Sequence, residues 1–216
     1  MKGNIRHKPY TFAEEVFNSL THGVGALLGI AGLVILLVFA AIDGNAWKIV
    51  SSALFGASMV FLYTSSTLYH AVSGRKKVIL NKIDHAAIYV LIAGTYTPFM
   101  LVTLRGPWGW SLFGAIWGLT VAGIVFKLYF YTPKLRTLSA LLYIVMGWLV
   151  IVATRPLLEN LSSGGLWWLL AGGVSYTAGV VFYLWKKLPF GHGIWHLFVL
   201  GGTVCHYFAI LLHVVL

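Results

Sequence analysis

Charged side chains are the scarcest feature of this sequence. Only 9% of the 216 residues are Asp, Glu, Lys or Arg, and just five are acidic. A soluble globular domain carries roughly 25% charged residues. This deficit is too large to be explained by a large buried core, so the composition argues against a water-soluble protein.

Cysteine is also nearly absent. The single cysteine, Cys205, lies in an apolar segment, and this excludes a disulfide framework. A cleaved signal peptide is not indicated, because Glu14, Glu15 and Asn18 interrupt the apolar content near the N-terminus and the first long apolar run begins only after His22.

Apolar runs of membrane-spanning length fill almost all of the remaining sequence, which is 59% hydrophobic. A helix needs about 20 residues to cross roughly 30 Å of hydrocarbon. We therefore predict an all-α membrane protein, a single seven-transmembrane helix bundle over residues 1–216, with residues 1–22 as a cytoplasmic juxtamembrane segment. The spans are expected at about 23–41, 47–72, 83–104, 109–130, 136–154, 165–185 and 192–214.

Basic residues are distributed unevenly between the connections. Twelve of the fifteen Lys and Arg residues lie in the N-terminal tail and around the second, fourth and sixth connections, whereas Lys48, Arg105 and Arg155 lie around the others. The positive-inside rule then places the N-terminus in the cytoplasm and the C-terminus outside, in a multi-pass protein of the cell membrane. Cations scattered over several connections, rather than gathered in one patch, argue against nucleic-acid binding.

Polar side chains within apolar spans are costly unless they are paired, so they mark candidate functional sites. His192 and His196 are four residues apart and share a helix face, as do Ser66 and His70. Asp84 follows His70 across a basic connection. The predicted topology brings His70, Asp84, His192 and His196 to a similar depth near the cytoplasmic face.

Three imidazoles and a carboxylate-held water are typical of catalytic zinc, which keeps one coordination position open. Asp84 can hold or deprotonate that water, and Ser66 can donate to a developing oxyanion. Two plainer interpretations stay open. The histidines can simply hydrogen-bond neighbouring helices, and Asp84 can pair with Lys82 or another loop cation.

Other polar residues have less certain roles. Glu14, Asn18, Thr21 and His22 fall near one helical face, either as caps of an interfacial helix or as a gate or support over the metal. His85 points away from Asp84 and is a weaker candidate. His206 lies about 15 Å deeper than His196 at 1.5 Å per residue, so it cannot bind the same ion and either lines a central cavity or bonds another helix.

In this order, Glu15-x-x-Asn18-x-x-Thr21-His22, Ser66-x-x-x-His70, Asp84 and His192-x-x-x-His196 resemble the hemolysin III family, the bacterial branch of the progestin and adipoQ receptor family. The resemblance covers the whole seven-span core. It implies Zn²⁺ bound by His70, His192 and His196, a water held by Asp84, and Ser66 nearby. The related adiponectin receptors and alkaline ceramidases imply hydrolysis of ceramide-type lipid amides.

The leading hypothesis is therefore a zinc-dependent intramembrane hydrolase of a lipid amide or ester bond, with membrane lipids as substrates. One alternative is a lipid-sensing or membrane-homeostasis protein in which the zinc is structural. Another is a cytolytic channel or a transporter, although a secreted pore-former needs a soluble form that so apolar a chain does not provide. Protein partners, the substrate and the oligomeric state are not indicated by the sequence.

Overall fold

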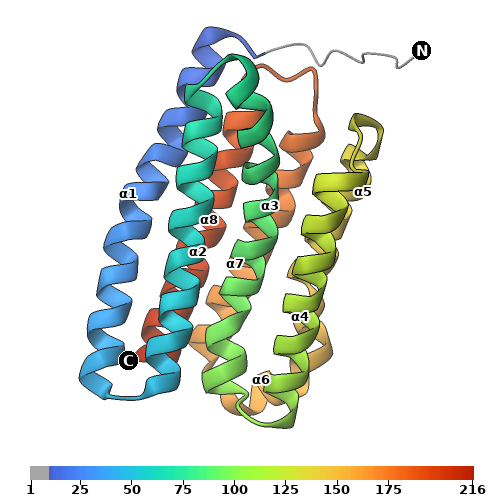
Figure 1. Cartoon of the computed structure of the whole chain (residues 1–216). Coiled ribbons are helices and arrows are strands. Elements are labelled where there is room, and N and C mark those ends of the chain that lie inside the picture. The colour runs from blue at the N-terminus through green and yellow to red at the C-terminus, as the bar shows by residue number, and fades with distance from the viewer. Residues whose placement is uncertain (1–9) are drawn as a thin grey trace.

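Long helices account for nearly all of the computed structural model, which describes residues 10–216 (Figure 1). Seven stretches are long and apolar enough to cross a membrane, and this confirms the predicted seven-helix fold. The α-helices are α1 (Phe12–Asp43), α2 (Ala46–Ala71), α3 (Gly74–Pro98), α4 (Pro107–Val125), α5 (Arg136–Gly147), α6 (Thr154–Asn160), α7 (Ser163–Leu184) and α8 (Gly191–Ile210).

Short π-helical and 3-10 segments adjoin several of these helices. π-Helical turns follow α3, α4 and α8, at η1 (Phe99–Thr103), η2 (Phe126–Phe130) and η5 (Leu211–Val215). A 3-10 turn, η3 (Pro133–Leu135), precedes α5, and a second one, η4 (Leu149–Ala153), joins α5 to α6. The segment from Pro133 to Asn160 therefore forms one span made of two helices.

The start of α1 differs from the expectation. The helix begins at Phe12, not near residue 23, because Thr11 and Glu14 form a reciprocal capping box at its N-terminus. Glu14 and Glu15 lie in the first turn, where the helix dipole favours negative charge. The polar residues expected in a juxtamembrane segment thus form the first turns of the helix. Likewise α3 begins at Gly74, before the span expected at 83.

The polar residues singled out in the sequence near the starts of α1 and α8 and the end of α2 lie at one end of the bundle. In Figure 1, α1 begins, α2 ends, α3 begins and α8 begins at the same end, while the C-terminus lies at the opposite end. The most extensive packing joins α1 to α2, α2 to α3 and α7 to α8, and α8 also packs against α1. Residues near the end of α2 and the start of α8 are therefore neighbours despite their separation in sequence.

A tyrosine from α3 forms hydrogen bonds with backbone groups at the break between α5 and α6. The Tyr96 hydroxyl lies 3.0 Å from the Met146 carbonyl and 2.8 Å from the Gly147 carbonyl, and it accepts from the Val150 N–H at 2.8 Å. Backbone groups freed inside a bilayer need such partners, because no water is available there. The break thereby leaves a stable kink in the middle of the span.

A glycine allows the close approach of α4 to the end of α3. Gly109 is buried, and a Cβ at this position would collide with the carbonyl oxygens of Met100 and Leu104. Gly114, one and a half turns along the same helix, faces open space. We expect Gly109→Ala to lower stability by about 1–3 kcal/mol through overpacking.

The matched variant Gly114→Ala should leave the melting temperature in detergent unchanged or slightly raised, since alanine favours helix. Equal melting temperatures for the two variants would show that the α3–α4 contact does not depend on Gly109.

The charge distribution predicts which end faces the cytoplasm. In a Cys205→Ser background, a membrane-impermeant maleimide added to intact cells should label Arg105→Cys but not Lys76→Cys, because the basic end is expected inside. Both exposed positions should react after permeabilisation. Labelling of Lys76→Cys alone in intact cells would reverse the predicted orientation.

Candidate metal centre

Three histidine rings meet at the polar end of the bundle. His70 comes from the last turn of α2, and His192 and His196 come from the first turns of α8. The Nε2 atom of His192 lies 3.2 Å from Nε2 of His70 and 3.1 Å from Nε2 of His196. One ligand atom from each ring lies within 4.8 Å of the others, so the three residues can hold a metal ion.

The spacing of these nitrogens suits a tetrahedral ion. Zn–N bonds of 2.0–2.1 Å at tetrahedral angles place neighbouring nitrogens about 3.3 Å apart. The observed separations of 3.2 and 3.1 Å are close to that value. An ion at the centre would require only small movements of the rings.

The first turns of α1 determine which ring nitrogens face this centre. Nδ1 of His70 lies 2.6 Å from Glu15 Oε2, and Nδ1 of His196 lies 3.2 Å from the Asn18 carbonyl and 3.2 Å from Thr21 Oγ1. The carboxylate and the carbonyl can only accept, so each Nδ1 donates a proton. In the neutral rings, the Nε2 lone pairs of His70 and His196 then point towards each other and His192.

This arrangement favours a cation. The neutral His192 ring has one N–H proton, which cannot serve both of its Nε2 contacts well. At least one contact therefore has no hydrogen bond, and a positive ion coordinated by the nitrogens would replace it. Partners on the distal nitrogen also fix the orientation of metal-binding histidines in proteins generally.

Asp84 lies near the histidines but outside their group of ligand atoms. It is buried on α3, with 4% of its surface exposed, and it lines a cavity inside the bundle. Ser66 is beside the carboxyl, and its hydroxyl is buried. The structure thus places Asp84 beside Ser66, and Asp84 lines the same cavity as His22, which stacks on His196.

The buried cation that acts on Asp84 is Lys127, a residue that the sequence analysis did not single out. Lys127 lies in η2 and interacts electrostatically with Asp84. Its Nζ donates to Ser139 Oγ at 3.3 Å and sits 3.4 Å from the centroid of the Tyr131 ring. Lys82, which the sequence offered as a partner for Asp84, instead reaches the Leu128 carbonyl at 3.5 Å.

Three other histidines, His22, His85 and His206, make contacts of their own. His85 Nδ1 lies 2.7 Å from the Asn81 carbonyl and 3.8 Å from Asp84 Oδ2. His206 donates through Nε2 to the Leu169 carbonyl at 3.1 Å, deep in the bundle. His22 stacks on His196, with ring centroids 3.5 Å apart and an 11° angle between the planes. None of the three belongs to the ligand group found in residues 10–216.

The two interpretations of the N-terminal polar group apply to different residues. Glu14 fits the first interpretation, because it belongs to the capping box of α1. Glu15, Asn18 and Thr21 contact the histidines instead. The sequence carried a signal for this, because Glu15, Asn18 and His22 follow an i, i+3, i+7 pattern that places them on one helix face.

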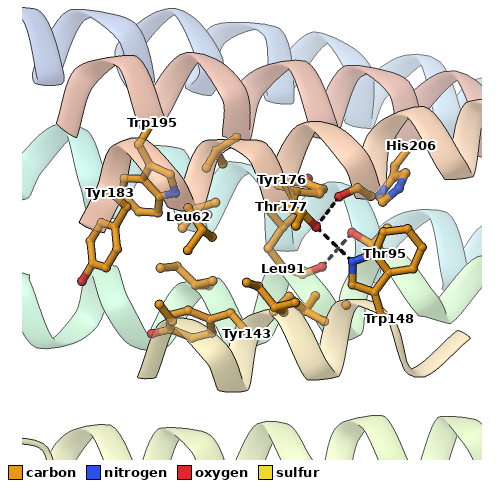
Figure 2. A pocket seen from close by; sticks show the side chains of 18 of the residues that line it. Leu62, Leu91, Thr95, Tyr143, Trp148, Tyr176, Thr177, Tyr183, Trp195 and His206 are labelled. Carbon is orange, nitrogen blue, oxygen red and sulfur yellow. Dashed lines mark hydrogen bonds between the residues drawn. The ribbon is translucent and has the colours of Figure 1, made fainter. Parts of the chain in front are cut away.

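The lining of an apolar cavity inside the bundle includes Asp84 and His22. Figure 2 shows the cavity between Tyr183 and Trp195 on one side and Trp148 and His206 on the other. Several of its polar groups are paired with each other: Trp148 Nε1 donates to Thr177 Oγ1 at 2.9 Å, and Thr95 Oγ1 donates to the Leu91 carbonyl at 2.8 Å. The lining therefore presents mainly hydrocarbon and aromatic surface. A second cavity shares Trp148 and His206 with it and extends towards Leu157 and Leu166.

Fold and site together define a multi-pass protein of the cell membrane with a three-histidine centre that can bind a metal ion. The chain belongs to the family described as Haemolysin-III related, which matches residues 10–207. This confirms the family resemblance seen in the sequence.

Several relatives match the chain over nearly its full length. A "Hemolysin-3 homolog" of Bacillus subtilis (strain 168) is 51% identical over 207 residues, covering 95% of this chain and 97% of the relative. "Hemolysin-3" of Bacillus cereus is 50% identical over 202 residues, covering 93% and 92%. The human "Monocyte to macrophage differentiation factor" is 29% identical over 217 residues, covering 96% and 87%.

The geometry predicts that all three histidines are needed to retain a metal. Purified His70→Ala, His192→Ala and His196→Ala should each lose the ion, because two imidazoles remain where three converge. Metal content measured by mass spectrometry is the readout. His213→Ala is the control, since His213 bonds Ser162 at the far end of the bundle. Full metal content in any of the first three variants would contradict the ligand set.

Proposed function

We propose that this protein is a zinc-dependent hydrolase of lipid amide or ester bonds. Its ion would be bound by His70, His192 and His196. The observation that carries the proposal is the approach of His192 Nε2 to the Nε2 atoms of His70 and His196 at 3.2 and 3.1 Å. An apolar cavity lies close by, because His22, which stacks on His196, is part of its lining. Three protein ligands leave a fourth position open, which is the arrangement of catalytic rather than structural zinc.

Zinc suits this donor set because imidazole nitrogens at tetrahedral spacing match its preferred ligands and geometry. When bound, the ion would supply Lewis acidity and acidify a water molecule at the open position. The chain's own residues supply the remaining chemistry.

In this proposal Asp84 acts as the general base. Its carboxylate takes a proton from the attacking water and then delivers it to the leaving nitrogen or oxygen, so that a fatty acid and an amine or alcohol are released. Lys127 is close enough to Asp84 to interact with it electrostatically. Ser66 has its hydroxyl closed off from the cavity, so we assign it to orienting Asp84 rather than to contacting an oxyanion.

The cavity supports a lipid as the substrate. Tyr143, Tyr183 and Trp195 surround its region near the polar end, and Leu91 lies deeper (Figure 2). An acyl chain placed there would bury hydrocarbon against an apolar lining, with its carbonyl group near Asp84. A soluble polar substrate would meet mainly hydrocarbon and aromatic surface along the same cavity.

One observation favours a second candidate, a lipid-sensing protein with a structural ion. The histidines join α2 to α8 and contact α1, so an ion at this position also ties three helices together. The relatives' name, "Hemolysin-3", refers to cytolysis, and no residue contact in this bundle favours that activity over the other two.

The two candidates differ in what Asp84 does. In zinc-loaded protein in lipid vesicles, Asp84→Asn should retain the metal and reduce fatty acid release from ceramide-type and ester lipids by about 10²-fold or more, because the general base is lost. Asp43→Asn is a matched control, since Asp43 pairs with Lys48 at the opposite end.

Wild-type turnover by Asp84→Asn would remove the proposed role of Asp84. A zinc-loaded wild type that hydrolyses neither lipid class, but binds zinc more tightly when lipid is present, would favour the sensing protein.

A further inference from the structure

Glu15 connects three helices at the polar end of the bundle. Its Oε2 atom lies 2.6 Å from His70 Nδ1 on α2, and its Oε1 atom lies 2.8 Å from Lys77 Nζ on α3. Lys77 in turn donates to the Tyr69 carbonyl at 3.1 Å and the Val72 carbonyl at 3.2 Å, which belong to the end of α2. The carboxylate therefore holds His70 on one side and is itself held by Lys77 on the other.

Glu14, the neighbouring acid, connects α1 to the start of α8. Its Oε1 atom accepts from the Phe190 N–H at 3.1 Å. Phe190 precedes His192 by two residues, and within residues 10–216 no other residue except glycine has a positive φ, here 56°. The Phe17 ring packs edge-on against Phe190, with centroids 5.7 Å apart. The strained start of α8 is thus held by the first turns of α1.

Tyr10 lies over the same histidines. Its ring centroid is 5.1 Å from that of His192 and 5.9 Å from that of His70. We refer to residues 10–17 as the N-terminal strap. The strap contacts both helices that carry the histidines, and it covers their rings at the polar end of the bundle.

We propose that Glu15 is a positioning residue for the metal centre, and that docking of the N-terminal strap is linked to ion binding. The inference rests on the proposed metal site but not on the hydrolytic reaction. By accepting the Nδ1 proton of His70, Glu15 keeps the Nε2 lone pair directed at the ion and makes it more basic. Loss of such a partner typically weakens metal affinity by 10–100-fold.

The linkage follows from reciprocity. If docking of the strap strengthens ion binding, then ion binding must stabilise the docked strap by the same factor. Coordination of His70 polarises its Nδ1–H bond and strengthens the hydrogen bond to Glu15. Removal of the ion should therefore loosen the strap, and undocking of the strap would open the centre at this end of the bundle.

Zinc affinity tests the positioning role directly. Full-length protein in detergent would be titrated with Zn²⁺ against a competing chelator for wild type, Glu15→Ala, Glu15→Gln and Glu14→Gln. We expect Glu15→Ala to bind about 10–100-fold more weakly. Glu15→Gln should be intermediate, because its amide oxygen still accepts from His70 but its neutral group no longer pairs with Lys77.

Glu14→Gln is the matched control at the adjacent position. The single amide oxygen of glutamine keeps one of the two contacts that Glu14 makes, either with the Thr11 N–H or with the Phe190 N–H, and neither contact is to a histidine. The zinc affinity of Glu14→Gln should therefore fall less than that of Glu15→Gln. A purely structural role for the acids predicts similar losses for Glu14→Gln and Glu15→Gln, and that result would overturn the positioning role. If Glu15→Ala does not fold, the comparison of the two glutamine variants still decides.

Hydrogen exchange tests the linkage. In wild type, removal of zinc should raise exchange of the backbone amides in residues 12–22 more than elsewhere in the bundle. In Glu15→Gln this difference should shrink. Zinc-independent exchange of this segment in wild type would overturn the linkage.

The outcomes also separate this inference from the proposed hydrolase. A protein that binds zinc as expected but hydrolyses no lipid would remove the hydrolase and leave the strap and Glu15 as inferred. A wild type that binds no zinc would overturn both.

Discussion

The polar end of this bundle depends on the hydrogen bonds between α1 and the Nδ1 atoms of two histidines. Inside a bilayer an unpaired imidazole is costly, so each ring needs a partner for its distal nitrogen. Glu15 provides it for His70, and the Asn18 carbonyl provides it for His196. Because both acceptors come from α1, the packing of a single helix determines which nitrogens face the centre. The Nε2 atoms of both rings then face His192, and a cation among them would replace a contact that has no hydrogen bond.

The sequence has few acidic residues, and most of them lie at one end of the bundle. Of the five acidic residues in the sequence, Glu14, Glu15 and Asp84 lie at the polar end of the bundle. The three have different environments. Glu14 caps a helix, Glu15 bridges a histidine and a lysine, and Asp84 is buried beside the cavity, under the influence of Lys127. A chain with few charges thus places most of its negative charge where histidines and lysines can balance it.

The fold was predictable because spanning a membrane imposes a strong and local constraint. Each span must be apolar over about 20 residues, and hydropathy reads this directly. The helix α1 begins before the predicted span for the same reason: hydropathy marks where the chain becomes apolar, whereas the helix begins at the Thr11 cap. The break after Gly147 was also missed, since it depends on the Tyr96 hydroxyl from another helix.

The candidate site could be predicted from the sequence only in part. The spacing of His192 and His196 and the topology pointed to a set of histidines whose rings the structure brings into contact. The choice between Lys82 and Lys127 as the cation near Asp84 was not readable, because it depends on how η2 packs against α3. The contacts of Phe190 were equally hidden, since a positive φ at a phenylalanine has no sequence signature.

Different helices carry different parts of the proposed chemistry. The ion would be held by α2 and α8 with support from α1, the proton would be handled by Asp84 on α3 under the influence of Lys127 after α4, and the acyl chain would lie against α5 and α7. Because Asp84 is not a ligand in this scheme, its removal can stop the reaction without releasing the ion. Because Glu15 does not line the cavity, its removal can weaken ion binding without altering the surface that would hold the acyl chain. Such a division lets metal retention, proton transfer and lipid binding change independently within one bundle.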